Sequence, residues 1–273
     1  MHEYQEVLET SESIMGENEK SSSFDSKIKS AVEIIKNSKY LICLTGAGIS
    51  TESNIPDFRS PKTGLWNQED AKILSKPGAI DEHLDFFWKV GFKIGRKILK
   101  AKPNKGHKIL AKWEVERGLL KSTITQNVDG LHQRAGSKNV IEIHGTAHEA
   151  RCMFCRGHYT LRNLVQEYKR KKRVPYCIVC AGPIKPSIVL FGESLPAAAI
   201  KEAWKEFENA DVALVIGSSL MVYPANSLPY NLSKKGGKII IINQMKTELD
   251  GIAEIVINDS ISKTLGKMEK ELG

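Results

Sequence analysis

Short apolar runs alternate with amphipathic stretches along most of this chain. The runs have the length of buried strands and occupy residues 40–44, 122–125, 140–143, 212–216, 238–242 and 255–257. The stretches around them keep apolar residues at helical spacing, at 25–38, 80–100, 105–117, 197–209, 225–235 and 260–271. Buried strands that alternate with helices predict an α/β fold with a doubly wound, Rossmann-like parallel sheet.

Five of the predicted strands end in glycines or hydrogen-bonding side chains. In chain order these are Gly46-Ala47-Gly48, then Gln126, Asn127 and Asp129, then His144, then Gly217-Ser218-Ser219, then Asn243. A doubly wound sheet binds its ligand beyond the carboxyl ends of its strands. We therefore expect loops from five strands to converge on one pocket.

The first strand runs into a Gly-x-Gly turn, which can bring bare backbone N–H groups up to a diphosphate. The full dinucleotide fingerprint needs a third glycine at position 51, where this chain has Thr51. A tight turn without a ligand therefore remains an alternative. Residues 55–60, IPDFRS, place a proline, an acid, an aromatic and a base together just beyond the turn, a combination that ordinary loops seldom show.

Several of the polar residues have a structural alternative. Asp129 is placed to cap the helix that follows it, and a histidine at a strand end, such as His144, is often only a satisfied polar residue. An imidazole with a pKa near neutrality also suits a general base. For the nearby His132 and His148 we favour structural roles.

Four of the five cysteines form two C-x-x-C pairs, Cys152 with Cys155 and Cys177 with Cys180. Two such pairs supply the tetrahedral thiolate set of a zinc site. Because four cysteines leave no open coordination position, we expect one structural Zn²⁺ per chain; a redox dithiol is the alternative. We expect Cys43, in the first strand, to be a small core residue.

Composition and charge favour a cytoplasmic globular protein with no membrane partner. Of the residues, 41% are hydrophobic, no stretch approaches the roughly 20 apolar residues of a membrane span, and the N-terminus lacks a signal pattern. Residues 1–25 carry seven acids and one lysine, so the net charge of +8 becomes +14 for residues 26–273. This basic body suits an anionic cofactor or a nucleic acid. Its bases are scattered apart from residues 169–173, which favours an ordinary solvated surface.

The ordered motifs of this chain resemble those of the sirtuins, the NAD-dependent protein-lysine deacylases, and its compact microbial members above all. The resemblance covers about residues 26–270. It rests on TGAGIS at 45–50, IPDFRS at 55–60, TQNVDGLH at 125–132, HG at 144–145, both C-x-x-C pairs, IVLFGE at 188–193, GSSL at 217–220, VYP at 222–224 and IN at 242–243.

The resemblance implies an NAD-dependent protein-lysine deacetylase. The acyl oxygen of the modified lysine would attack C1′ of the nicotinamide ribose, and nicotinamide would leave. His144, the general base, would then activate a ribose hydroxyl, giving free lysine and O-acetyl-ADP-ribose. The alternatives are a protein mono-ADP-ribosyltransferase that uses the same NAD site and a zinc-ribbon protein that binds nucleic acid. The deacetylase interpretation does not require nucleic acid.

The resemblance also implies the residues of the site. Asn127 and Asp129 would assist His144 in catalysis. The residues expected to bind NAD are Gly46, Ala47, Gly48, Ser50, Asp57, Phe58, Arg59, Trp66, Gln126, Asn127, Asp129, Gly217, Ser218, Ser219, Asn243 and Gln244. Those expected to bind the acetylated peptide are Val189, Phe191, Gly192 and Val222, with main-chain pairing at 189 and 192.

From the polar composition and the cysteine spacing, we expect a flexible acidic tail at 1–24 and a zinc-binding module at 151–185. The Rossmann-like NAD-binding domain would comprise 25–150 and 186–273, with a helical and loop insertion at about 60–104. One departure from the family pattern is Asn54, where the family usually has glycine; Asn can adopt left-handed angles. Residues 80–102 contain no tyrosine to complete the Tyr-x-x-Arg pair of sirtuins that prefer acidic acyl groups. We therefore expect a preference for neutral acyl groups.

Overall fold

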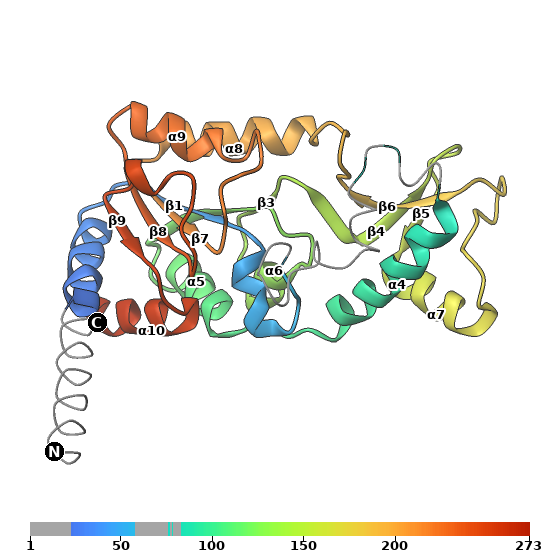
Figure 1. Cartoon of the computed structure of the whole chain (residues 1–273), viewed down its shortest axis with the longest axis horizontal. Coiled ribbons are helices and arrows are strands. Elements are labelled where there is room, and N and C mark those ends of the chain that lie inside the picture. Colours follow the sequence, from blue (N-terminus) through green and yellow to red (C-terminus); the bar gives the residue numbers. More distant parts are fainter. Residues whose placement is uncertain (1–22, 58–75, 77, 79–82) are drawn as a thin grey trace, which may run out of the picture.

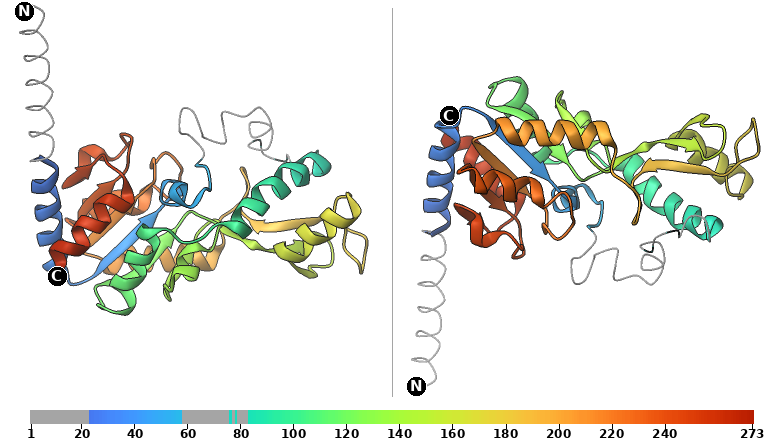
Figure 2. Two further views of the ribbon diagram at one scale, coloured as in Figure 1. Left: turned by 90° about the horizontal axis from the view of Figure 1, so that it is seen from below. Right: turned by 90° about the horizontal axis from the view of Figure 1, so that it is seen from above.

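The computed structural model describes residues 23–57, 76, 78 and 83–273 (Figure 1). Most of the predicted tail, and the part of the predicted insertion that precedes residue 83 apart from residues 76 and 78, lie outside these residues. The protein has a larger part built on a parallel sheet and a smaller part built on an antiparallel sheet. The smaller part projects from one end of the larger part, away from the C-terminus (Figure 2).

The larger sheet has six parallel strands in the order β3-β2-β1-β7-β8-β9. They are β3 (Val140–Glu142), β2 (Leu120–Thr125), β1 (Leu41–Thr45), β7 (Val212–Ile216), β8 (Lys238–Ile242) and β9 (Ile255–Ile257). Within this sheet the order is 3-2-1-4-5-6, that of a doubly wound dinucleotide-binding fold. The predicted fold class is confirmed.

Helices cover both faces of this sheet because its strands are apolar on both faces. Leu41 and Cys43 pack with the helix at 23–36, α5 (Lys105–Val115) and α10 (Ile261–Leu272). Ile42 and Leu44 point to the other face, toward α8 (Ala197–Asn209) and α9 (Ser227–Lys234). Figure 1 shows α8 and α9 on one side of the sheet and α5 and α10 on the other.

The smaller sheet has the order β5-β4-β6, with β5 (His158–Thr160), β4 (Gly145–Cys152) and β6 (Ile184–Ile188). Its core is closed by α4 (Leu84–Lys100) and α7 (Leu161–Lys171). Aromatic residues of α4 belong to this core: Phe87, Trp88 and Phe92 are buried, and Trp88 Nε1 donates to the main-chain oxygen of Ile184 at 3.0 Å.

One local expectation was wrong, and one helix was not predicted. The apolar residues 188–191 alone predict a short extended run, but strand β6 ends at Ile188 and the chain then turns. Lys185 fixes this turn, because its Nζ donates to the oxygen of Ile188 at 2.9 Å and pairs with Glu193 at 2.7 Å. The bases at 169–173 lie between the cysteine pairs and are exposed, and Lys169–Lys171 form the last turn of α7. This helix was not predicted because its three buried residues give only a weak periodicity.

Three further short elements are η1 (Ala47–Ser53), α6 (Leu131–Ala135) and η3 (Asp250–Ile252). Among the described residues, no helix is both long and apolar enough to cross a membrane.

Candidate active site

The turns after β1 and β7 pack against each other at the point where the strand order reverses. The N–H of Gly46 donates to the oxygen of Ile216 at 3.0 Å, and the N–H of Gly48 to that of Gly217 at 2.8 Å. A Cβ on Gly46 would lie 2.7 Å from the oxygen of Gly217, and one on Gly217 would lie 2.4 Å from the nitrogen of Ile49. The close approach of the two turns therefore requires glycine, whatever ligand is bound.

The chain beyond Gly48 forms η1, in which Thr51 is exposed. Asn54 ends this element with φ 63° and ψ 24°, and its N–H donates to the oxygen of Thr51 at 3.0 Å. The expectation that Asn54 adopts the left-handed conformation is confirmed. Position 51 needs no glycine because the chain coils here into a 3₁₀ helix with its side chain in solvent.

A buried chain of hydrogen bonds joins the loop after β1 to the loop after β2. Asn127 Nδ2 donates to the oxygen of Gly46 at 3.0 Å and lies 3.2 Å from Ser50 Oγ. Ser50 Oγ donates to Asp129 Oδ2 at 2.7 Å, and Asp129 Oδ1 accepts the N–H of Leu131 at 2.9 Å. Asp129 thus holds the first turn of α6, as the capping alternative expected, and faces Ser50 as well.

Gln126 and Ser218 connect the loop after β2 to the loop after β7. Gln126 Nε2 donates to Ser218 Oγ at 2.9 Å, and the same oxygen lies 3.2 Å from the N–H of Leu220. Together with the hydrogen bonds between Asn127, Ser50 and Asp129, this bond brings polar groups from the loops after three neighbouring strands to one edge of the sheet. The expected convergence is confirmed for these three loops.

His144 lies beside Gln126 and is half-buried. Its Nδ1 lies 3.0 Å from the main-chain oxygen of Gln126. A carbonyl oxygen only accepts, so Nδ1 carries the hydrogen, and Nε2 of the neutral ring keeps a lone pair. Burial lowers the pKa of His144 below its usual 6.5, although the hydrogen bond to Gln126 acts in the opposite direction. At neutral pH, the ring is therefore ready to accept a proton at Nε2.

The backbone around His144 is fixed by the antiparallel pairing of β4 with β6. Gly145 has φ 72°, and a Cβ there would lie 2.1 Å from the oxygen of Ser187, so only glycine allows the two strands to approach this closely. The N–H of Val189 then donates to the oxygen of His144 at 2.9 Å. This bond places the segment after β6 directly beside the histidine.

A second polar layer lies beneath the loops and was missed from the sequence. Thr45 Oγ1 donates to Thr125 Oγ1 at 2.8 Å and lies 2.9 Å from Nε2 of the buried His132. The ring of His132 lies 4.9 Å from that of His107, centroid to centroid. Burial lowers the pKa of His132 to about 3, and the neighbouring His107 lowers it further. The structural role favoured for His132 agrees with this burial.

Asn104 fixes His107 and η1 together. Its Oδ1 accepts the N–H of His107 at the start of α5 and lies 3.0 Å from His107 Nδ1, while its Nδ2 donates to the oxygen of Ile49 at 2.7 Å. Burial lowers the pKa of His107 to about 4, although the charges of Asp129 and Glu52 act in the opposite direction. An asparagine just before a helix is a typical N-cap, and this was the signal available in the sequence.

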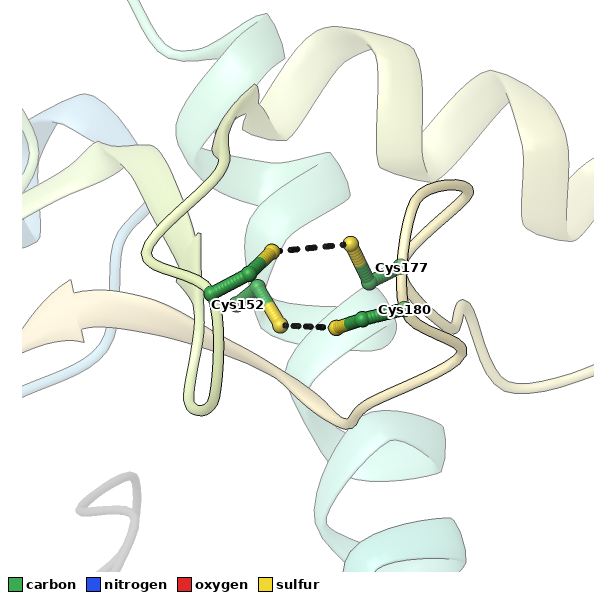
Figure 3. Close-up of side chains that lie close together, drawn as sticks. Cys152, Cys177 and Cys180 are labelled. Carbon is green, nitrogen blue, oxygen red and sulfur yellow. Dashed lines mark hydrogen bonds between the residues drawn. The ribbon is translucent and has the colours of Figure 1, made fainter.

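The predicted metal ligands come together in the smaller part. The sulfur atoms of Cys152, Cys155, Cys177 and Cys180 all lie within 4.8 Å of one another. Two pairs, Cys152 with Cys180 and Cys155 with Cys177, have Sγ···Sγ distances of 3.4 Å. Figure 3 shows Cys152, Cys177 and Cys180 close together. A disulfide requires about 2.05 Å, whereas tetrahedral zinc with Zn–S bonds of about 2.3 Å separates its sulfurs by about 3.8 Å.

The surroundings of the four sulfurs also fit a zinc ion. The N–H groups of Phe154 and Val179 each donate to a cysteine sulfur at 3.4 Å. The hydroxyl of Tyr159 donates to Cys177 Sγ at 3.1 Å, and this bond is the main reason why the pKa of Cys177 falls to about 6. Four sulfur donors fill a tetrahedral shell, so the bound ion would be structural.

The Sir2 family model matches residues 46–224. This chain belongs to the Sir2 family. It is 45% identical over 244 residues to an NAD-dependent protein deacetylase of Thermodesulfovibrio yellowstonii, an alignment that covers 89% of this chain and 94% of the relative. The resemblance to microbial sirtuins is confirmed.

Solved Sir2 structures share this fold. One is a complex of a histidine-to-alanine Sir2 variant with a deacetylated p53 peptide and 3′-O-acetyl ADP ribose, with a TM-score of 0.85 and 38% identity over 89% of this chain and 98% of that one. Another is a complex of Sir2 with a p53 peptide and NAD⁺, with a TM-score of 0.82 and 39% identity over 89% and 98% of the two chains.

The remaining expected residues of this Sir2 protein differ in accessibility. Asn243 is buried, and its Nδ2 donates to the oxygen of Met245 at 2.7 Å, whereas Gln244 is exposed. The residues that are half-buried are Ala47, Gly48, Asp57, Val189, Val222 and Ser219. Phe191 and Gly192 are exposed. Phe58, Arg59 and Trp66 lie outside the described residues.

Proposed function

We propose that this chain is an NAD-dependent protein deacetylase that moves the acetyl group of a modified lysine to ADP-ribose and forms O-acetyl-ADP-ribose. The observation that carries the proposal is the tautomer of His144. It holds a lone pair on Nε2 beside converging polar loops at the switch point of a doubly wound sheet. Its Sir2 relatives bind NAD⁺, acyl peptides and acetyl ADP ribose in structures of the same fold.

The residues at this edge of the sheet fit NAD. Glycine turns and amide and hydroxyl side chains from the loops after β1, β2 and β7 offer the donors and acceptors that phosphates and riboses need. NAD supplies a nicotinamide–ribose bond that can break and an ADP-ribose that accepts the acetyl group. In this assignment Gly46, Gly48, Gly217 and Ser218 line the nucleotide, with Asn243 at the adenosine end.

The protein's own residues position the reactants and move one proton. His144 takes the proton of a ribose hydroxyl at Nε2, while the carbonyl of Gln126 holds the hydrogen on Nδ1. Asn127 and Asp129 orient the ribose and nicotinamide pockets. We assign Ser50 to the positioning of these two residues, because its hydroxyl is buried between them.

The acetylated peptide is assigned to the segment after β6 and the segment after β7. Since the N–H of Val189 is bonded to His144, a peptide strand that pairs with Val189 would use its carbonyl oxygen. Gly192, Phe191 and Val222 complete the binding surface, with Phe191 against the acyl-lysine side chain. The missing tyrosine at 80–102 favours neutral acyl groups, and a faster removal of succinyl than of acetyl from one peptide would contradict this preference.

The four-cysteine cluster is assigned one structural zinc ion, because its donor set is complete without water or substrate. We also propose the cytoplasm as the location of the protein. All five cysteines are free thiols, and four of them are grouped as metal ligands, which suits a reducing compartment.

The test is a nicotinamide-release assay with NAD, in the presence and absence of an acetyl-lysine peptide, with mass spectrometry of the products. We expect release that depends on the peptide and yields equal amounts of deacetylated peptide and O-acetyl-ADP-ribose. Label that passes from NAD to protein without loss of acetyl would favour the mono-ADP-ribosyltransferase. Nicotinamide release at the same rate with and without the peptide would contradict the deacetylase assignment.

A further inference from the structure

Helices α4 and α7 of the smaller part enclose a depression of about 310 Å³ on the protein surface. Among the described residues that line it, seven are basic and none is acidic. The basic residues are Lys89, Lys93, Arg96, Lys97 and Lys100 from α4, and Lys169 and Lys172 from the end of α7. We call these seven residues and the depression between them the basic groove.

No described acidic residue neutralises the positive charge of the basic groove. Within the described part of the chain, none of the seven side chains forms an ion pair, and all seven are exposed. Lys171, one residue away on the same helix, behaves differently and pairs with Glu167 at 2.8 Å. Clustered like charges repel one another, so an unneutralised group in a concave surface favours an anionic partner.

The base of the groove is rigid. The ring of Phe92 stacks on that of Tyr168 with centroids 4.1 Å apart, and Trp88 stacks on Phe92 at 4.8 Å. Phe92 and Trp88 belong to α4, and Tyr168 belongs to α7, so this stack fixes the two helices relative to each other. The cations therefore stand on a preorganised frame, which reduces the entropy cost of binding.

The spacing of the bases suits a partner with a regular repeat of negative charge. Along α4 a base occurs on every turn, at 89, 93, 96 and 97, and 100, a stretch of about 16 Å at about 1.5 Å per residue. The backbone of a nucleic acid carries a phosphate for about every 3.4 Å of each strand. One strand can therefore meet several of these cations in succession while lysines of α7 approach it from the other side.

Other anionic partners fit less well. Protein interfaces have an apolar centre and few lysines, whereas the apolar residues of this groove are mostly covered by its own core. A helix that binds membranes inserts its apolar face, and the apolar face of α4 already packs on α7 and the small sheet. We propose that the basic groove binds the phosphate backbone of nucleic acid without reading its base sequence. This binding is separate from the deacetylase site and does not depend on it.

The proposal is tested by fluorescence anisotropy with a labelled DNA duplex of about 20 base pairs, and with the matching single strand, between about 50 and 200 mM salt. The groove variant is Lys93→Gln/Lys97→Gln/Lys169→Gln/Lys172→Gln in the full chain. The control variant, Lys29→Gln/Lys39→Gln/Lys201→Gln/Lys205→Gln, removes the same charge from exposed lysines of the larger part.

We expect the groove variant to bind at least about tenfold more weakly and to have a shallower dependence of log K on log salt, by up to about 0.9 for each phosphate that is no longer neutralised. The control variant should change little. Equal weakening in both variants, or no binding by the parent, would overturn the proposal. So would groove-dependent binding of poly-glutamate or of anionic lipid vesicles in the absence of nucleic-acid binding.

Two checks keep this result independent of the deacetylase assignment. Binding is measured without NAD, and the groove variant should keep its zinc and its activity on a short acetylated peptide. If that variant loses its zinc, the variant Lys89→Gln/Arg96→Gln/Lys100→Gln, which leaves α7 intact, replaces it with the same expected reduction of affinity.

Discussion

His144 Nδ1 lies 3.0 Å from the main-chain oxygen of Gln126, and this hydrogen bond decides which ring nitrogen is basic. The carbonyl can only accept, so the proton stays on Nδ1 and the lone pair stays on Nε2. Gln126 in turn reaches Ser218 through its side chain. One residue thus fixes the tautomer of the histidine and joins two loops of the nucleotide site.

Replacement of the histidine tests this assignment. We expect His144→Ala to lower deacetylation by about 10²- to 10⁴-fold, since a general base is removed, while NAD binding measured by calorimetry remains close to that of the parent. His158→Ala, at an exposed histidine of β5, is the matched control and should retain full activity. A decrease of both NAD binding and thermal stability in His144→Ala would mean that the ring is structural.

The pH dependence follows from the lowered pKa of His144. The ring must be neutral to accept a proton, and burial lowers its folded-state pKa below 6.5. Activity should therefore fall only on the acid side, with the midpoint of the acid limb of kcat/KM below pH 6.5, and reach a plateau near neutrality. A limb centred above about pH 7 would contradict this tautomer and its environment.

The variant Ser50→Ala tests whether Ser50 positions Asn127 and Asp129 or contacts NAD directly. The change removes the hydroxyl that Asp129 accepts at 2.7 Å and leaves a buried carboxylate oxygen without that donor. We expect kcat to fall by about 10- to 100-fold because the ribose pocket is misaligned, with little change in the KM for the peptide. Thr51→Ala, at the neighbouring exposed hydroxyl, should be nearly silent. A raised KM for NAD with unchanged kcat would instead make Ser50 a direct ligand of the cofactor.

Zinc removal tests the metal centre. Cys152→Ala should release the zinc and lower the stability of the smaller part, because the sulfurs hold β4 and the 177–180 loop together. Cys43→Ala is the control, since that cysteine is also buried but lies in β1 of the larger sheet. Zinc content measured by mass spectrometry should be close to one per chain in the control and close to zero in Cys152→Ala. A full complement of zinc in Cys152→Ala would contradict the ligand set.

The central strands were predictable because their signal is strong. The predicted bounds of α8, β7, β8 and β9 agree with the structure, since continuous apolar runs between clear breaks leave few alternatives. Helix α7 and the strands of the small sheet were missed because they are short or bury few residues. The site residues were predicted from the family motifs. The structure adds the reason for glycines such as Gly217, because the turns after β1 and β7 pack too closely for a Cβ at this position.

Contacts between distant residues could not be predicted from one sequence. Thr45 meets His132, and the lysines of α4 face those of α7, although about 70 to 90 residues separate them along the chain. Scattered lysines therefore suggested an ordinary solvated surface until the fold brought seven bases together. The predicted division into domains stays a prediction, although α4 packs with the small sheet.

Acid should weaken the fold through His107 and His132. Their folded-state pKa values, about 4 and about 3, lie below the ordinary 6.5, so below pH 6.5 the unfolded chain binds protons that the folded chain does not. The contribution of these two histidines to stability is therefore fully present above pH 6.5. As the pH drops toward 4, the free energy of unfolding falls by up to about 1.4 kcal/mol per pH unit for each histidine. The measurement is urea unfolding at about pH 7, 6 and 5.

The variant His132→Asn isolates this effect. The variant and the parent both keep all four zinc ligands. Cysteine protonation therefore contributes equally to the stability of each and cancels when their free energies of unfolding are compared. We expect the stability of the variant to depend on pH less steeply than that of the parent between about pH 6 and 5, because His132 no longer titrates on unfolding while His107 and His144 still do. His158→Asn, at the exposed histidine, should leave the slope as it is. If the parent and His132→Asn have the same slope, the free energy of unfolding is not linked to protonation of this buried pair.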